Sequence, residues 1–345
     1  MLYSDSADFG VALVPTLFPL FPLSDAQKLC SHRLPGKMLD SQHLVTVSCN
    51  ICGADDFTVL YPAGRAQVNQ IVRCNHCGLL YANPRRMADH VDIETWPEDP
   101  TFDLARERPL RYEKEQLQVR DYADTRKLLK ELCGGAGRLL EIGSGLGFML
   151  DLFHKEFWEV VGVEPDRNAS LHARRKFGLD IRSLTLEKAG FPDESLDAVV
   201  MLHVIEHVPD PMATLREINR ILKPGGHLIL ETPRYDTLMF KILGRRERSL
   251  SCDGHIFFFT TDSLRRAYTA AGFELRHFQC PPRSLTLDRL AFNLGVITKS
   301  PALYERLKPF TRRPPLDKIK LSINVRDMQR VCVRRVTRIV ASPSS

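Results

Sequence analysis

Short apolar segments alternate with amphipathic segments over most of residues 106–336. Residues 106–132 are rich in Glu, Lys, Leu, Gln and Arg, with apolar residues at helical spacing, so they predict a helix that ends at Gly134. Seven further segments have the composition of short strands, namely 138–142, 160–163, 179–181, 197–202, 226–232, 273–278 and 329–334. Helical patterns separate the first six of them. This alternation predicts an α/β fold made of βαβ units.

The two ends of the chain carry weaker patterns. Residues 9–23 are apolar, but Pro15, Pro19 and Pro22 interrupt any helix, and no Lys or Arg precedes them as in a secretory signal. We therefore interpret residues 1–43 as a leader without regular structure and residues 337–345 as a tail. Met38 offers an alternative start of translation, directly ahead of the first structured module.

Two CxxC pairs lie between residues 44 and 84. Cys49 and Cys52 form the first pair and Cys74 and Cys77 the second, each pair is followed by glycine, and the segments between them have strand composition. Zn²⁺ prefers four soft ligands in a tetrahedron, and a CxxC turn places two sulfur atoms on one side of it. The spacing therefore predicts a zinc ribbon over residues 44–84, in which His76 is not a ligand. Four unrelated buried cysteines are the alternative.

Length and charge narrow the choice of function. A chain of 345 residues suggests about two domains, and no apolar run reaches the ~18 residues of a membrane-spanning helix. Residues 283–345 contain 14 Lys and Arg against 4 Asp and Glu, whereas the whole chain has a net charge of +6, so residues 1–282 are net negative. Nine cysteines, four of them in CxxC pairs, favour reduced thiols and a cytoplasmic location.

A glycine loop follows the strand expected at 138–142. Gly143, Gly145 and Gly147 are spaced GxGxG, one place short of the GxGxxG dinucleotide fingerprint, and a helix is expected from Phe148. Strand, glycine loop and helix together allow a ligand to approach the backbone closely. A plain turn is the alternative for these glycines.

Two carboxylates near this loop indicate which kind of cofactor it binds. Glu141 stands two residues before the first glycine, and Glu164 ends the strand expected at 160–163. A carboxylate at Glu141 would repel a pyrophosphate but would suit a cation, and an acid at the end of the second strand can accept both hydroxyls of a ribose. The pair therefore favours S-adenosylmethionine over NAD.

The chain resembles the class I S-adenosylmethionine-dependent methyltransferases. The segments that carry the resemblance are LLEIGSGLGFML (139–150), VVGVEPD (160–166), FPDESLDAVVMLHVIEHVPDP (191–211), LKPGGHLILETP (222–233) and HIFFFTTDSLRRAYTAAGFEL (255–275). The sequence CNIC…CNHCGLLYANPR is similar to the opening of the subgroup that has a zinc-binding ribbon. The EHVPDP segment is similar to the ubiquinone-biosynthesis O-methyltransferases.

The resemblance implies a fold and a cofactor site. A Rossmann-like seven-stranded sheet is expected over residues 85–336, with the strand at 329–334 antiparallel to the rest and with residues 281–326 as a basic insertion ahead of it. Glu141, Gly143, Ser144, Gly145 and Gly147 would hold the methionine end of S-adenosylmethionine. Glu164 would bind the ribose, Leu186 or Glu187 would border the adenine, and His203 would lie close to the sulfonium.

Candidate catalytic residues cluster after the fourth strand. His203, Glu206 and His207 follow it, and His255 precedes an apolar Phe-Phe-Phe segment. Each can act as a base toward a hydroxyl or acidic carbon. The spacing could also hold a divalent metal, but His203 stands where the ubiquinone enzymes have an acid, which argues against metal use. The alternative for Glu206 and His207 is a purely structural role in the turn after the strand. The alternative for His255 is a histidine that is packed in a loop and has no contact with substrate.

The acceptor is the least defined part of the prediction. Resemblance favours an oxygen or carbon atom of a small or lipid- or nucleotide-linked molecule. The second candidate is a zinc-ribbon rRNA or tRNA methyltransferase that binds RNA through the basic C-terminal region, but the negative charge of residues 1–282 argues against it. The basic region could equally contact an anionic substrate or a membrane surface, or form a solvated helical cap.

Overall fold

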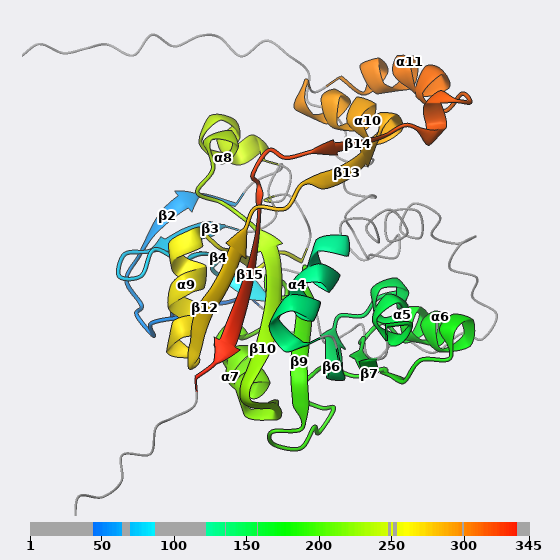
Figure 1. The fold of residues 1–345 in the computed structure, drawn as a ribbon. Helices are drawn as coiled ribbons and strands as arrows, with labels where there is room; N and C mark the ends of the chain where they lie inside the picture. Colours follow the sequence, from blue (N-terminus) through cyan, green and yellow to red (C-terminus); the bar gives the residue numbers. More distant parts are fainter. Residues whose placement is uncertain are drawn as a thin grey trace, which may run out of the picture.

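The computed structural model describes residues 44–63, 70–86, 122–134, 136–156, 158–247, 250, 254–298 and 300–336. The interpretations of residues 1–43 and 337–345, the start at Met38, and residues 106–121 of the expected first helix lie outside the described residues. The described part of that helix is α4 (Ala123–Cys133), which ends at Gly134 in the left-handed conformation. Figure 1 shows the arrangement of the elements.

A seven-stranded sheet forms the centre of the fold. Its order is β12-β15-β10-β9-β6-β7-β8, and β15 pairs antiparallel with both of its neighbours. The strands are β6 (Gly137–Ile142), β7 (Trp158–Val163), β8 (Ile181–Arg182), β9 (Leu196–Leu202), β10 (Leu222–Pro233), β12 (Phe273–Gln279) and β15 (Met328–Arg335). The predicted seven-stranded sheet with an antiparallel last strand is confirmed.

Helices cover both faces of this sheet, because its strands bury side chains on both sides. Alternate residues of β9 belong to different core clusters: Val199 and Met201 pack with α7 (Pro211–Ile221) and α9 (Thr261–Ala270). Ala198 and Val200 pack with α4 and α5 (Phe148–His154). The remaining helix of the βα units is α6 (Arg167–Phe177), which Asp166 caps by accepting hydrogen bonds from two backbone amides.

Two details of the sequence prediction are wrong. The third strand lies at Ile181–Arg182, not at 179–181, because Gly178 ends α6 in the left-handed conformation and the chain needs two more residues to reach β7. The segment 183–195 between β8 and β9 holds turns and no helix, although a helical pattern was expected there. Gly190, at φ 63°, and Pro192 interrupt it.

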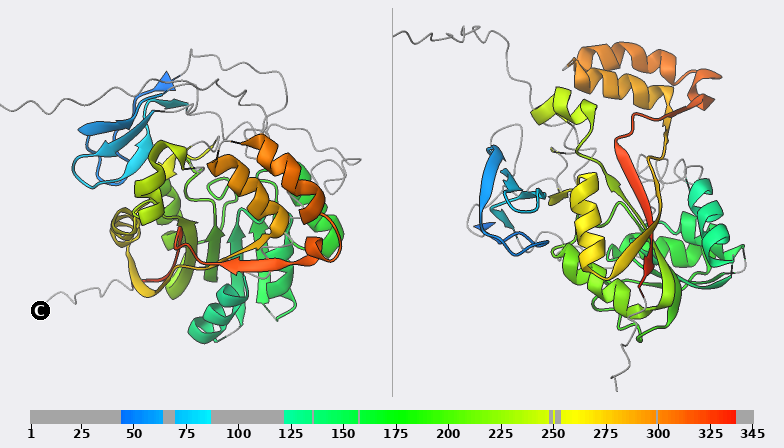
Figure 2. Two further views of the ribbon diagram at one scale, coloured as in Figure 1. Left: turned by 90° about the horizontal axis from the view of Figure 1, so that it is seen from above. Right: turned by 60° about the vertical axis from the view of Figure 1, so that its left-hand side comes forward.

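The N-terminal module is a small antiparallel sheet. Strands β2 (Phe57–Tyr61), β3 (Ile71–Cys74) and β4 (Leu80–Ala82) pair in sequence, and β1 (Leu44–Val45) pairs with β5 (Arg85–Arg86). The fourth strand of the sheet comes from the other domain, since β11 (Phe257–Phe258) pairs antiparallel with β4. Figure 2 shows this sheet beside α9. The module therefore shares a sheet with the α/β domain.

The insertion between β12 and β15 is a helical hairpin on a two-stranded stalk. Strands β13 (Arg283–Thr286) and β14 (Lys320–Ile323) pair antiparallel. Between them lie α10 (Leu287–Ile297), α11 (Pro301–Thr311) and a short 3-10 helix (Leu316–Lys318). Asp288 joins the helices by accepting hydrogen bonds from Thr311 and Arg312. Figure 1 shows the hairpin beyond the end of the sheet at which β10 ends, on the same side as α8 (Leu238–Leu243).

Candidate functional site

The loop between β6 and α5 holds three glycines in the left-handed region. Their φ angles are 72° at Gly143, 51° at Gly145 and 76° at Gly147. A Cβ atom on Gly143 would lie 2.3 Å from Cγ2 of Val204, and one on Gly147 would lie 2.8 Å from Cβ of Ala173. Glycine is required at both positions by conformation and by space. The loop consequently packs against the end of β9, at the carboxyl edge where open α/β sheets bind ligands.

Glu164 approaches this loop from the end of β7. Its Oε2 atom accepts a hydrogen bond from the backbone amide of Gly145 at 2.8 Å, and its Oε1 atom accepts one from the amide of Asp166 at 3.0 Å. The carboxylate is buried. Because each carboxylate oxygen can accept more than one hydrogen bond, Glu164 keeps capacity for the two hydroxyls of a ribose.

Glu141, on β6, and Ser144, in the loop, are also buried. The hydroxyl oxygen of Ser144 has no hydrogen-bond partner among the described residues. A buried hydroxyl without a partner is costly, so a ligand or water is expected to satisfy it. Together with Glu164, this gives the loop two carboxylates and an unsatisfied hydroxyl, which fits a cationic ligand that carries hydroxyls, such as S-adenosylmethionine.

The sequence expectation for the adenine end concerns Leu186 and Glu187. Leu186 is buried in the larger core cluster. The Oε1 atom of Glu187 accepts a hydrogen bond from the hydroxyl of Thr214 at 2.9 Å, so its carboxylate is directed to the start of α7. Of the two residues, Glu187 already has a partner within the protein. The role of either residue toward adenine stays a prediction.

His203 begins the loop after β9 in an unusual conformation. Its φ is 58°, which a non-glycine residue seldom adopts, and such residues cluster at functional sites. The ring lies between two carboxylates, with Nδ1 3.7 Å from Oε1 of Glu206 and Nε2 3.3 Å from Oε1 of Glu231. Burial disfavours the charged ring, but hydrogen bonding to Glu206 and Glu231 outweighs it and raises the pKa of His203.

Glu231 links His203 to the last strand of the sheet. Its other carboxylate oxygen, Oε2, accepts a hydrogen bond from Nε of Arg330 at 2.6 Å, and Arg330 is fully buried on β15. Burial would raise the pKa of Glu231, yet the hydrogen bond from His203 and the charge of Arg330 lower it to about 2. This side chain is therefore a fixed anion beneath His203.

A second cluster brings Glu206, His207 and His255 together. One ligand atom from each lies within 4.8 Å of those of the other two. The rings of His207 and His255 meet edge to face, with centroids 4.6 Å apart, and Nδ1 of His207 is 2.9 Å from the backbone oxygen of Gly254. Burial opposes ionisation of Glu206, but hydrogen bonding to His203 and the nearby histidine rings lower its pKa to about 2.

This cluster has the donor set of a divalent metal site. The contact with Gly254 leaves Nε2 of His207 as the natural ligand atom, an arrangement usual for metal-binding histidines. Residues 205–207, which carry Glu206 and His207, form a turn and not a helix. The structure thus brings His255 to Glu206 and His207, which lie 48 or more positions earlier in the sequence. His203 contacts the same cluster through Glu206 and also contacts Glu231.

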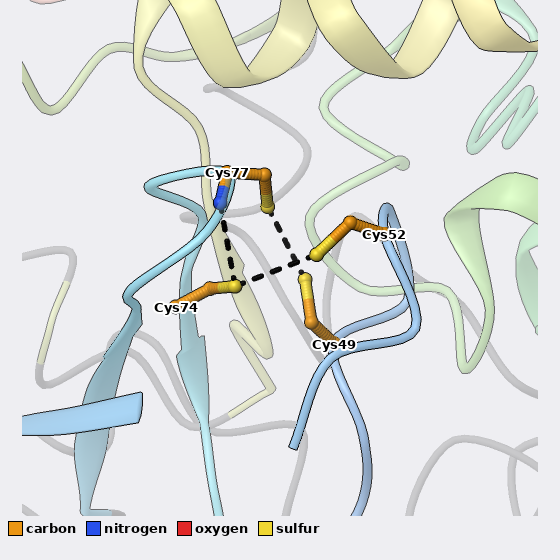
Figure 3. Close-up of side chains that lie close together, drawn as sticks. All are labelled: Cys49, Cys52, Cys74 and Cys77. Atoms are coloured by element: carbon orange, nitrogen blue, oxygen red, sulfur yellow. Dashed lines mark hydrogen bonds between the residues drawn. The ribbon is translucent and has the colours of Figure 1, made fainter. Parts of the chain in front are cut away.

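The four cysteines of the CxxC pairs converge (Figure 3). Sγ of Cys49 lies 3.4 Å from Sγ of Cys77, Sγ of Cys52 lies 3.5 Å from Sγ of Cys74, and all four sulfur atoms are within 4.8 Å of one another. Hydrogen bonding with Cys77 lowers the pKa of Cys49 to about 5. Four convergent thiols in two glycine-terminated turns fit Zn²⁺. His76 is exposed and has no sulfur contact among the described residues.

The ribbon also contacts the candidate active site. The backbone amides of Ile256 and Phe257 donate to the carbonyl oxygen of Glu206 at 2.8 and 3.1 Å, and Phe257 is the first residue of β11. Arg85 is buried, donates to the carbonyl oxygen of Pro209 at 2.9 Å and lies over the ring of Phe257. Strand β11 thus connects the ribbon sheet to the loop that carries Glu206.

Sequence analysis missed Glu231, Arg330 and Arg85. Glu231 was visible as one acid inside the apolar strand LILETP, and Arg330 as one base inside QRVCV. Charges in buried strands need partners, so the two could have been paired with each other. Nothing in the sequence pointed to the contacts of Arg85.

The sequence was compared with family models and with known proteins. Residues 112–277 match the model of a methyltransferase domain family. A ubiquinone biosynthesis O-methyltransferase from Bradyrhizobium sp. is 34% identical over 149 residues, which are 40% of this chain and 57% of that protein. A ubiquinone/menaquinone biosynthesis C-methyltransferase from Desulfotalea psychrophila is 31% identical over 100 residues, 28% of this chain and 41% of that protein.

A solved structure, an S-adenosylmethionine-dependent methyltransferase from Mesorhizobium loti, is 20% identical with a TM-score of 0.43 and covers 62% of this chain and 98% of its own. The chain spans about half the length of the curated relatives it matches. Residues 112–277 thus match a methyltransferase domain family, and the chain is similar over part of its length to ubiquinone biosynthesis O-methyltransferases. Among the described residues, no helix is long and apolar enough to cross a bilayer.

Proposed function

We propose that the protein transfers a methyl group from S-adenosylmethionine to an oxygen or carbon atom of a small or lipid- or nucleotide-linked acceptor. The observation that carries the proposal is the contact of Glu164 with the glycine loop at Gly145, beside buried Glu141 and Ser144. Likeness to ubiquinone biosynthesis O- and C-methyltransferases supports an oxygen or carbon acceptor. The RNA alternative receives no support from these relatives.

In this proposal the glycine loop and Glu164 bind the cofactor, and Glu141 and Ser144 complete the methionine end. Bound S-adenosylmethionine would supply an activated methyl carbon that an acceptor atom displaces in line. His203 directly follows β9 and precedes Val204, which packs on Gly143, so its ring would border the reacting atoms. Held between Glu206 and Glu231, it would orient the acceptor.

Proton removal from the acceptor falls to the second cluster. His207 and His255 lie beside Glu206, and a neutral imidazole there would take the proton of an acceptor hydroxyl or acidic carbon. A divalent metal held by Glu206, His207 and His255 would instead lower the pKa of that hydroxyl. The cysteine cluster of Cys49, Cys52, Cys74 and Cys77 would hold a structural Zn²⁺ that stabilises the ribbon.

The test is a transfer assay on the whole chain. The protein is incubated with S-adenosylmethionine labelled in the methyl group and with an extract of its host, and the products are separated into lipid, small-molecule and RNA pools. The proposal expects label in the lipid or small-molecule pool, lost when Glu164 is replaced by alanine. Label confined to RNA, or equal labelling by the variant, would overturn it.

A further inference from the structure

The segment that leads from α11 back to the two-stranded stalk exposes large apolar side chains. We call residues 310–321, from the end of α11 to the start of β14, the hairpin end. Phe310 is 57% exposed, and Leu316, Ile319 and Leu321 are exposed at 38%, 38% and 39%. Single exposed apolar residues need no explanation, but four within twelve positions concentrate exposed apolar surface on one short segment, which is typical of interaction sites.

Cations are interleaved with these apolar side chains. Arg313, Lys318 and Lys320 are exposed, and none of them makes an ion pair within the described part of the chain. Arg313 lies over the ring of Phe310, 5.6 Å from its centroid. In contrast, Arg312 at the same end is paired with Asp288. Asp317 is the one acid of this segment, so the hairpin end presents apolar side chains together with an excess of positive charge.

A second exposed apolar element lies at the same edge of the sheet. Helix α8 follows the carboxyl end of β10, and Leu238 and Ile242 on it are 73% and 70% exposed, with Lys241 between them. Figure 2 shows α8 and the hairpin helices together beyond this edge. The glycine loop also lies at the carboxyl edge of the parallel strands, so the exposed elements and the candidate site belong to the same end of the molecule.

We propose that the hairpin end docks on the surface of an anionic lipid bilayer. Apolar side chains enter the boundary between headgroups and acyl chains, while lysine and arginine at the same depth attract anionic headgroups. RNA would account for the cations but not for the four exposed apolar side chains. Docking itself does not depend on methyl transfer. A docked protein could receive a lipid-linked acceptor from the bilayer, and this second step rests on the proposed function.

Vesicle co-sedimentation tests the docking without cofactor or acceptor. The full chain is mixed with vesicles of phosphatidylcholine alone or of phosphatidylcholine with phosphatidylglycerol at 3:1. Binding is expected to the anionic vesicles and to fall as salt is added. Arg313→Gln with Lys320→Gln should weaken it by about 5-fold for each charge removed. Phe310→Ser with Ile319→Ser should abolish the binding that survives at high salt, because it removes the inserted side chains.

The matched control is Lys127→Gln with Lys130→Gln, two exposed lysines on α4, which ends next to the amino end of β6. This control removes the same charge and should bind vesicles like the wild type. Circular dichroism would confirm that all variants fold. Absence of binding, equal binding to both kinds of vesicle, or an equal loss of binding in the control would overturn the proposal. It would also be overturned if the protein bound RNA and not vesicles, and if the Arg313 and Lys320 changes abolished that RNA binding. None of these outcomes bears on cofactor binding.

Discussion

Arg330 and Glu231 form a buried ion pair across the junction of β15 and β10, with Nε of Arg330 2.6 Å from Oε2 of Glu231. The other oxygen of the same carboxylate lies 3.3 Å from Nε2 of His203. One carboxylate therefore connects the inserted antiparallel strand to His203, the first residue after β9. The pair orders the edge of the sheet at which the candidate site lies.

Removing one partner of this pair should cost stability. Glu231→Gln removes the carboxylate that pairs with the buried guanidinium of Arg330, and we expect the free energy of unfolding to fall by about 3–5 kcal/mol. Urea unfolding followed by circular dichroism measures it. The control is Glu274→Gln on β12, where an exposed carboxylate pairs with Arg276 at 3.0 Å and should contribute less than about 1 kcal/mol. Equal effects of the two changes would contradict the role given to the buried pair.

The buried carboxylate of Glu231 also predicts how the stability of the protein depends on pH. Its pKa is about 2 in the folded protein against 4.5 for an ordinary glutamate, so it binds a proton more readily when unfolded. Its contribution to stability is thus present above pH 4.5 and lost as the pH falls toward 2. Stability of the wild type should fall by up to about 1.4 kcal/mol more per pH unit than that of Glu231→Gln within this range. Urea unfolding at several pH values measures both proteins. If the unfolding free energies of the wild type and of Glu231→Gln fell with the same slope in this pH range, a buried anion at Glu231 would be contradicted.

Gly143 tests the packing of the glycine loop on β9. Gly143→Ala places a Cβ atom 2.3 Å from Val204 in a left-handed conformation, so both strain and overlap follow. We expect a loss of about 2–4 kcal/mol in unfolding free energy and no cofactor binding. Gly178→Ala is the control, because Gly178 has φ 69° but open space around it. It should lose about 1 kcal/mol and still bind the cofactor; a Gly143 variant with the same behaviour would count against the close packing.

Glu164 tests the ribose site. Glu164→Ala removes charge-assisted hydrogen bonds worth about 1.5–3 kcal/mol, so S-adenosylmethionine should bind at least tenfold more weakly. Equilibrium dialysis with labelled cofactor measures this. Glu159→Ala on the same strand, where the carboxylate is 73% exposed and pairs with Arg138, should leave the affinity unchanged. An unchanged affinity in the Glu164 variant would reject its assignment.

The cysteine cluster predicts one zinc ion per chain. Cys52→Ser removes a ligand, so elemental analysis should find no zinc and the soluble yield should drop, because a ribbon this small depends on its metal to fold. Cys280→Ser, which changes a cysteine outside the cluster, should keep the zinc. Wild-type protein purified without zinc would contradict this assignment. Because β11 joins the ribbon to the loop of Glu206, the Cys52 variant should also lose transfer activity.

Sequence patterns were sufficient for most of the sheet and for the convergence of the cysteines. Strand composition located six of the seven strands and misplaced β8, which is only Ile181–Arg182, and the resemblance implied how they join in one sheet. The CxxC spacing constrains the four thiols locally, so spacing alone located their convergence. The placement of Glu141, Gly143 and Glu164 at one edge followed from the rule that parallel strands end together. Their roles as ligands for a cofactor remain predictions.

The features that sequence could not supply are long-range pairings. Strand β11 joins the ribbon sheet through β4, although some 175 positions separate them, and two residues of Phe-Phe composition do not reveal their partner. The connection 183–195 lacks its expected helix, because Gly190 and Pro192 outweigh the pattern around them. His255 meets His207 only through this tertiary packing.

Calorimetric titration of the full chain with S-adenosylmethionine, with NADH titrated in parallel, tests the central assignment most directly. The account predicts saturable binding of one S-adenosylmethionine per chain and no heat from NADH. No binding of S-adenosylmethionine, or binding of NADH in its place, would contradict it.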